Sequence, residues 1–256
     1  PDTYLGPFQA LNLRTVWKFT VLVMAVSAAG HVALRLFGPR VGLPLAGFAS
    51  GFISSTVTIG AMGQRALAEP SLMGPAVAGA VLSSISTLVL MATVLLAVSP
   101  ATLQALIVPL ACSGVAALAY GALFLFRAMR QPPAMPIEPG RPFKLQAALT
   151  LALVAAAVLV GTAALNAWLG RGGIALAALL GGFADTHAAA ASVATLVASD
   201  RILPAQTVVP VLAALSANAV SKAVFAAASG GRRFAAQVVP GLLLMIAAAW
   251  AGYALV

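Results

Sequence analysis

Residues 174–199 read IALAALLGGFADTHAAAASVATLVAS, an apolar run about as long as a membrane-spanning helix with an aspartate and a histidine at its centre. A charged side chain near the middle of a bilayer costs roughly 2.5–3.5 kcal/mol on insertion scales, so such residues usually face a partner, a cavity or a pathway. The stretch from Gly181 to His187 is therefore the first candidate for a functional site.

The composition is that of an integral membrane protein. Of the 256 residues 62% are hydrophobic and 7% are charged, against about 25% charged residues in soluble domains. The apolar runs are continuous and rich in Ala, Leu and Val, without the alternation of β-barrel strands. The sequence predicts an all-α polytopic membrane protein with about eight transmembrane helices, at residues 15–37, 42–66, 72–98, 102–127, 144–169, 174–199, 205–229 and 234–256.

A proline-rich hydrophilic stretch at residues 131–143 divides the chain. Residues 1–130 are expected to form a first four-helix membrane repeat and residues 144–256 a second one. The halves match at a constant offset of 135 residues, and this predicts an internal duplication. The matched pairs are Gly47 with Gly182, Phe48 with Phe183, Pro75 with Pro210 and Ser86 with Ser221.

The relative orientation of the two repeats depends on the number of crossings. Four full crossings in each half give parallel repeats related by an axis along the membrane normal. If one polar segment of each half is re-entrant, the number becomes odd and the repeats are inverted. The glycines at positions 47, 51, 60 and 63 leave that alternative open, because a helix breaks readily at glycine.

The distribution of basic residues predicts the orientation in the membrane. With eight crossings, eight basic residues lie on the side of the linker and five on the other side, which places both termini and the linker in the cytoplasm of a bacterium, with the protein in the inner membrane. The first set is Arg14, Lys18, Arg65, Arg127, Arg130, Arg141, Lys144 and Arg201, and the second is Arg35, Arg40, Arg171, Arg232 and Arg233.

Polar residues gather in the second segment of each half. In the second half Asp185 recurs with Ser192 and Ser199 on one helix face, and His187 points elsewhere unless the backbone is distorted near Gly181. Hydroxyls in membrane helices often bond only to their own helix, but so dense a group favours a lined cavity. In the first half the polar residues are Ser50, Ser54, Ser55, Thr56 and Thr58.

The third segment of the second half carries Asn218, Ser221 and Lys222 within an apolar run. A buried lysine needs an opposite charge or loses its proton. Asp185 is the only carboxylate in the apolar body of the chain, so an Asp185–Lys222 ion pair is one interpretation, and extension of Lys222 towards the membrane surface is the other. The first half has Ser83, Ser86 and Thr87 at the matched positions.

Other functional classes find little support in the sequence. Neither a nucleophile elbow nor a zinc-protease motif occurs, and no phosphate-binding loop is present, so we expect neither an enzyme nor a cofactor. The basic residues are dispersed, which speaks against nucleic acid as a partner. Cys112 is the single cysteine, and Asp185 is the only plausible metal-ligand carboxylate in the membrane, so the identity of any metal is unknown.

The chain resembles the uncharacterised membrane domain that follows the MgtC domain in MgtC/SapB-type proteins. The resemblance lies in residues 47–58, which read GFASGFISSTVT, in residues 182–185, in Asn218 with Lys222, and in Asn12 with Leu13. It departs at His187, where that family usually has an acidic residue, and this weakens a divalent-cation site. The resemblance implies a role in magnesium or other cation homeostasis and an N-terminal membrane domain preceding Pro1.

Two functional hypotheses follow. The first is an inner-membrane secondary transporter or ion-permeation domain, with a polar midplane site between the repeats for a small ion or small polar solute. The second is a non-transporting scaffold or regulatory domain that binds a partner membrane protein, with a homo-oligomer left open. The candidate pathway residues are Asp185, Lys222, Asn218, His187, Ser50, Ser54, Ser55, Thr56, Thr58 and Ser221.

Overall fold

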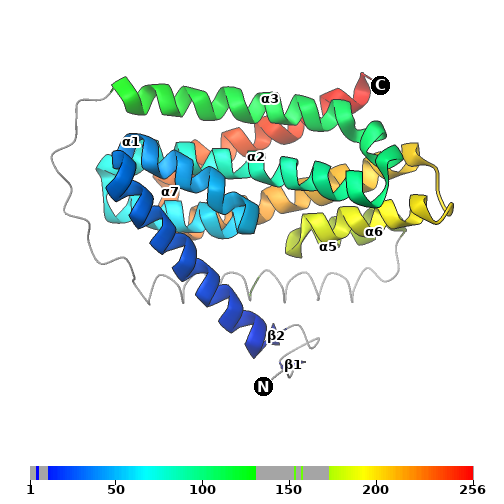
Figure 1. Ribbon diagram of the computed structural model, residues 1–256, viewed down its shortest axis with the longest axis horizontal. Coiled ribbons are helices and arrows are strands. Elements are labelled where there is room, and N and C mark those ends of the chain that lie inside the picture. Colours follow the sequence, from blue (N-terminus) through cyan, green and yellow to red (C-terminus); the bar gives the residue numbers. More distant parts are fainter. Residues whose placement is uncertain (1–3, 6–10, 131–152, 154–156, 158–172, 256) are drawn as a thin grey trace.

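A computed structural model describes residues 4–5, 11–130, 153, 157 and 173–255 (Figure 1). The predicted linker and the predicted crossing at 144–169 lie outside this part, except for single helical positions. The elements are α1 (Leu13–Ala68), η2 (Pro70–Leu72), α2 (Met73–Val98), α3 (Pro100–Arg130), α5 (Ile174–Ala184), α6 (Thr186–Ala198), η3 (Pro204–Thr207) and α7 (Val208–Ala254), preceded by the paired two-residue strands β1 (Tyr4–Leu5) and β2 (Leu11–Asn12).

The predicted all-α architecture is confirmed for these residues, apart from the short strand pair. Four described helical stretches are long and apolar enough to cross a membrane: Val41–Ala68, Pro70–Val98, Pro100–Arg130 and Pro204–Ala254. Because apolar side chains cover much of the outer surface, a lipid environment suits this bundle. Exposed examples are Val115, Leu118 and Phe126 on α3 and Leu243 on α7.

Two of the long helices contain glycine breaks. Gly38 in α1 has φ 69° and ψ 170°, and Gly231 in α7 has φ 68° and ψ −177°. This region of backbone conformation is essentially reserved for glycine. At Gly231 the chain folds back on itself, because the Trp250 indole N–H donates to Ser216 Oγ over 3.1 Å. Residues 208–230 and 232–254 are therefore two antiparallel helices.

The polar stretch of α1 is a helical hairpin. The backbone is extended at Ser54, with φ −163° and ψ 105°. Beyond this break Thr58 Oγ1 lies 2.9 Å from Ser50 Oγ, whereas eight residues of straight helix rise about 12 Å. Gly47 before the break and Met62 after it both contact Gly79 of α2. Residues 39–68, hereafter the first hairpin, thus descend and return along the same helix.

Helices α5 and α6 form a second hairpin, residues 174–198. Here the extended residue is Asp185, with φ −152° and ψ 107°. A methyl group built on Gly181 would lie 3.3 Å from the Cβ of Ala189, eight residues further on. The predicted crossing at 174–199 is therefore folded back at its centre, like the first hairpin.

The two hairpins open at opposite ends of α2. The first returns to Ala68, beside the start of α2, where Leu67 lies close to Gly231 of α7. The second returns to Ala198, which lines a pocket together with Val98 at the other end of α2. Since α2 starts near Gly231 and ends near Pro204, it runs antiparallel to residues 208–230 of α7.

Helix α3 and residues 232–254 of α7 are also antiparallel. Tyr120 Oη donates to the Gln237 carbonyl over 2.8 Å, and Gly252 lies against Cys112. Arg130 and the C-terminal end of α7 consequently lie at opposite ends of the bundle (Figure 1). The expectation that the linker and both termini share one side of the membrane is therefore wrong for the linker and the C-terminus.

Close backbone approach holds the hairpins against the helices. A methyl group on Gly47 would overlap the Gly79 backbone, and one on Gly182 would overlap the Ala214 backbone. Membrane helices associate through such small residues, because lipid leaves little hydrophobic driving force between them. The pairs Gly47–Gly79 and Gly182–Ala214 are each related by the offset of 135 residues.

Candidate functional site

The tip of the first hairpin is built from hydroxyl side chains. Ser54 Oγ accepts a hydrogen bond from the Val57 amide over 3.3 Å, so it caps the returning helix. Thr58 Oγ1 donates to the Ser54 carbonyl over 2.8 Å and contacts Ser50 across the hairpin. Ser50, Ser55 and Thr58 are buried and Thr56 is half-buried. The predicted first-half cluster is thus brought together at one tip.

The tip of the second hairpin carries the predicted carboxylate. Asp185 Oδ1 accepts from the amides of His187 and Ala188, over 2.8 and 3.2 Å, and so caps α6. The same oxygen lies 3.3 Å from His187 Nδ1. The break at Asp185 is the distortion that lets Asp185 and His187 face each other, where a straight helix would separate them.

Thr87 of α2 joins the two tips. Its hydroxyl donates to Ser55 Oγ of the first hairpin over 2.7 Å. Its carbonyl lies 3.2 Å from His187 Nε2 of the second hairpin. The same hydroxyl oxygen accepts from Lys222 Nζ of α7 over 3.0 Å. One residue therefore contacts both hairpins and α7 at the centre of the bundle.

Lys222 is fully enclosed, with 3% of its surface exposed. Its ammonium group donates to Thr87 Oγ1 and, over 3.3 Å, to Ser84 Oγ. It does not reach the end of the helix, so extension towards the membrane surface is wrong. The Asp185–Lys222 ion pair is wrong as well, since no ion pair joins the two residues and Asp185 instead binds α6 amides and His187.

Two enclosed polar atoms near this centre have no hydrogen-bond partner. They are Oδ1 of Asn218, one helical turn before Lys222 on the same face of α7, and Oγ1 of Thr186, the first residue of α6. Their residues are 7% and 1% exposed. Unsatisfied buried polar atoms are scarce in folded proteins and call for an explanation.

The remaining candidates have structural contacts. Ser221 Oγ donates to the Phe183 carbonyl over 3.0 Å. Ser192 and Ser199 donate to carbonyls of their own helix and are exposed, so they do not line the centre. Among the described residues, groups of His, Cys, Asp and Glu that could hold a metal ion are absent.

Several contacts recur in both halves at the offset of 135 residues. Ser86 Oγ donates to the Phe48 carbonyl over 2.6 Å, and this corresponds to the Ser221–Phe183 bond. Thr87 and Lys222 are also 135 positions apart, and they contact each other. In a two-fold arrangement only residues at the axis meet their own counterparts. The hairpin tips, however, are 131 positions apart, so Asp185 occupies the place of Ser54 and not of Ser50.

Ser84 and Thr87 are the site residues that sequence reasoning missed. Thr87 was noted only as the neutral counterpart of Lys222, and Ser84 was not considered. The matched position itself was the available signal, because residues matched across an axis can touch. Nothing in the sequence pointed to Ser84.

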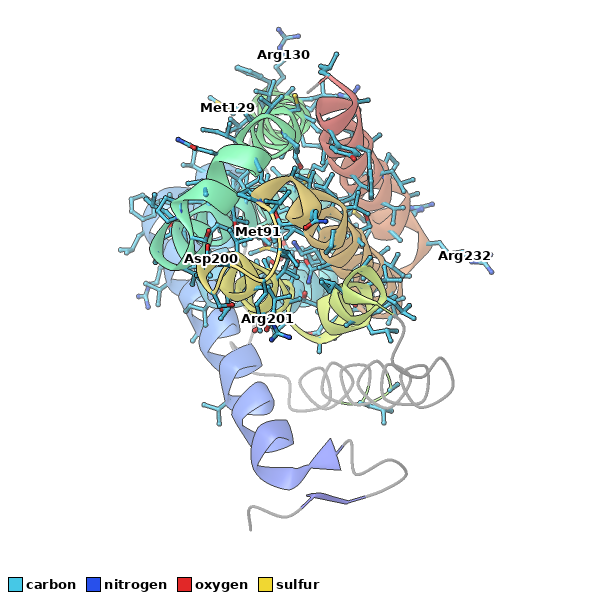
Figure 2. All side chains as sticks on the ribbon, turned by 90° about the vertical axis from the view of Figure 1, so that its right-hand side faces the viewer. Met91, Met129, Arg130, Asp200, Arg201 and Arg232 are labelled. Carbon is cyan, nitrogen blue, oxygen red and sulfur yellow. The ribbon has the colours of Figure 1, made fainter. Side chains whose placement is uncertain are left out.

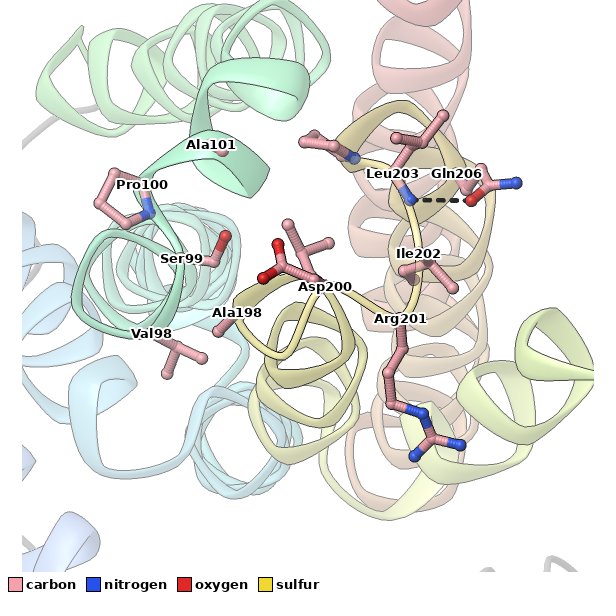
Figure 3. A pocket seen from close by; sticks show the side chains of 12 residues that line it. Val98, Ser99, Pro100, Ala101, Ala198, Asp200, Arg201, Ile202, Leu203 and Gln206 are labelled. Atoms are coloured by element: carbon pink, nitrogen blue, oxygen red, sulfur yellow. Dashed lines mark hydrogen bonds between the residues drawn. The ribbon is translucent and has the colours of Figure 1, made fainter.

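A pocket of about 670 Å³ opens where α6 turns towards α7. Figure 3 shows Asp200, Arg201 and Gln206 on one side of it and Ser99 with Pro100 on the other. The matching region at the other end of the bundle is closed: a methyl group on Gly63 would lie 2.8 Å from the Gly230 amide nitrogen, and Phe234 is fully buried. The two ends of the bundle therefore differ.

The family described as "Domain of unknown function (DUF4010)" matches residues 21–230. The chain belongs to this family. The match covers both hairpins, α2, α3 and the first part of α7, and hence every residue of the site. It does not connect the chain to MgtC/SapB-type proteins, and no curated protein or solved structure matches the chain.

Proposed function

We propose that this DUF4010 chain is a secondary transporter or ion-permeation domain whose site lies between the tips of two re-entrant hairpins. The observation that carries the proposal is the contact of both tips with Thr87. Broken helices that meet near the bilayer midplane are a recurring way to build substrate sites in transporters. Non-helical backbone at membrane depth is tolerated only where protein buries it or where it lines a water-filled cavity.

The proposal includes an internal duplication with inverted repeats. The paired contacts Ser86–Phe48 and Ser221–Phe183, the antiparallel course of α2 and α7, and the opposite openings of the hairpins support it. With the crossings predicted at 15–37 and 144–169, each half has three crossings and one hairpin. Six crossings and two hairpins thus replace the expected eight crossings.

The orientation follows from the arginines at the two ends. Arg65 lies near the start of α2, Arg127 and Arg130 near the end of α3, and Arg232 and Arg233 follow Gly231, all at one end. Figure 2 views the bundle from the other end, which carries Arg201 and Asp200. The positive-inside rule places the arginine-rich end in the cytoplasm. The linker would be cytoplasmic and the C-terminus external, in the bacterial inner membrane.

The unequal ends fit alternating access, in which a site opens to one side at a time. The pocket beside Asp200 would belong to the open side, and the Gly63–Gly230 contact to the closed side. Inverted repeats can exchange these roles by rocking or gating around a fixed site. The resemblance to the domain that follows MgtC extends the proposal to ion homeostasis, by analogy only.

Water access to the tips tests the proposal. Cysteines replace Ser54, which is half-buried, or Ala188, which is exposed, in a Cys112→Ala background. A hydrophilic maleimide should label both, because a transport site must admit water. The control is Val115→Cys, since Val115 is 66% exposed on the outer face of α3 and should face lipid. It should remain unlabelled.

The scaffold hypothesis makes the opposite prediction. If the hairpin tips serve only to join helices, Ser54→Cys and Ala188→Cys should resist the reagent as strongly as Val115→Cys does. Such uniform protection in intact membranes would refute the transport proposal and favour a scaffold or regulatory domain bound to a partner membrane protein.

A further inference from the structure

The ammonium group of Lys222 lacks a compensating carboxylate. Its two protein contacts are the neutral hydroxyls of Ser84 and Thr87. Hydroxyl dipoles reduce the cost of enclosing a charge but do not neutralise it. An ammonium has three N–H donors, so one remains for a further acceptor.

The described acidic residues are engaged elsewhere. Asp185 is 58% exposed at its side chain and is bound to the α6 amides and His187. Glu69 accepts from Ser71 Oγ beside the start of α2, and Asp200 lines the pocket at the opposite end of the bundle. In the part of the chain that the structure covers, Lys222 therefore has no acidic partner.

Two helices also begin at this centre. The returning helix of the first hairpin starts at Ser55, and α6, with 13 residues, starts at Thr186. The beginning of a helix carries a partial positive charge and amides without helical partners. Both features favour an anion. Because Thr87 contacts Ser55 and His187, both helix starts lie beside the residue that holds Lys222.

The unpaired atoms supply an independent reason to expect a ligand. Thr186 Oγ1 lies at the start of α6 and Asn218 Oδ1 lies one turn from Lys222, and both are enclosed without a partner. A ligand with several polar atoms would satisfy them together. An oxyanion that also carries a hydroxyl or amino group offers both acceptors and donors, and a bare metal ion offers neither.

We infer that the solute of this site is a small oxyanion, bound by Lys222 and the start of α6 with Thr186 and Asn218 as polar partners. The inference rests on the proposed transport function and names the class of its substrate. It differs from the cation that the family resemblance implied. The recognising chemistry is that of a carboxylate, phosphate or sulfate group.

Binding to the full chain in detergent provides the first test. Thermal unfolding is measured with succinate, phosphate or sulfate, each against sodium chloride at equal ionic strength. At least one oxyanion should raise the Tm of the wild type. Lys222→Met should lose this response, with half-saturation at least about tenfold weaker, because truncating one partner of an enclosed charge pair has effects of this size or larger.

Arg232→Met is the matched control. It also removes one positive charge, but Arg232 projects from the surface at the arginine-rich end (Figure 2). Its response to oxyanions should equal that of the wild type. A Tm rise that persists in Lys222→Met, or that disappears equally in Arg232→Met, would show a nonspecific salt effect and overturn the inference.

Uptake into proteoliposomes separates this inference from the transport proposal. Labelled succinate, phosphate and sulfate are compared with K⁺ and Mg²⁺, in the wild type and in Lys222→Met. Oxyanion uptake that Lys222→Met abolishes supports both proposals. Uptake of K⁺ or Mg²⁺ alone, unchanged in Lys222→Met, overturns the oxyanion and leaves transport standing. With protected hairpin tips and no uptake of any probe, both proposals fail.

Discussion

Thr87→Val should lower the free energy of unfolding by roughly 2–3 kcal/mol, because it removes hydrogen bonds to a buried charge and to a buried hydroxyl. Thr87 Oγ1 is one of the two acceptors of Lys222 and the only printed partner of Ser55 Oγ. Valine has nearly the same shape as threonine, so the loss reports on the hydroxyl. Denaturant titration of the purified protein, with helicity as the signal, measures the change.

The same change in a Lys222→Met background distinguishes the reason. Replacing an enclosed charge by an apolar side chain of similar length is often neutral or stabilising. In that background Thr87→Val should cost only about 1 kcal/mol, the value of a neutral hydrogen bond. If the two changes were additive, Thr87 would not support the charge of Lys222, and its place at the centre of the site would be lost.

Gly47→Ala and Gly182→Ala should each impair folding severely. The added methyl group would overlap the backbone of Gly79 in the first case and of Ala214 in the second. Backbone cannot yield as a flexible side chain does, so the hairpin must shift away from its helix. Overpacking of this kind costs typically 1–3 kcal/mol and occasionally more. Tm and the yield of monodisperse protein after extraction measure the effect.

Gly114→Ala is the matched control, in the interior of α3. Its methyl group would meet only Leu88 Cδ1, at 3.9 Å. Alanine is favoured over glycine inside a helix by roughly 0.5–1 kcal/mol, so the variant should be unchanged or slightly more stable. If Gly47→Ala and Gly182→Ala behaved like Gly114→Ala, the close packing of the hairpins against α2 and α7 would be refuted.

The sequence predicted much of the site and less of the fold. Five hydroxyl residues, Asp185 and Lys222 were recognisable because polar groups are conspicuous in apolar segments. Hairpins were harder to predict, because residues 42–66 and 174–199 have the length and hydropathy of full crossings. Serine and aspartate as helix caps were the local signals for a restart at Ser54 and Asp185.

The partner of Lys222 could not be derived from charge alone. Sequence reasoning paired it with the one available carboxylate, but Asp185 satisfies the first amides of α6 instead. Which of the two uses prevails depends on where the hairpin turns, and this is a tertiary property. The same four-residue difference in the hairpin tips moved the counterpart of Asp185 from Ser50 to Ser54.

Disulfide cross-linking within each hairpin tests the central claim most directly. In a Cys112→Ala background, cysteines replace Ser50 with Thr58, or Gly181 with Ala189, and are oxidised in membranes with copper phenanthroline. The account predicts that both pairs form intramolecular disulfides, since Oγ atoms of the first pair are 2.9 Å apart and the Cβ positions of the second 3.3 Å apart. In a straight helix either pair would be about 12 Å apart and could not be bridged. Free thiols in both pairs after oxidation would contradict the re-entrant hairpins.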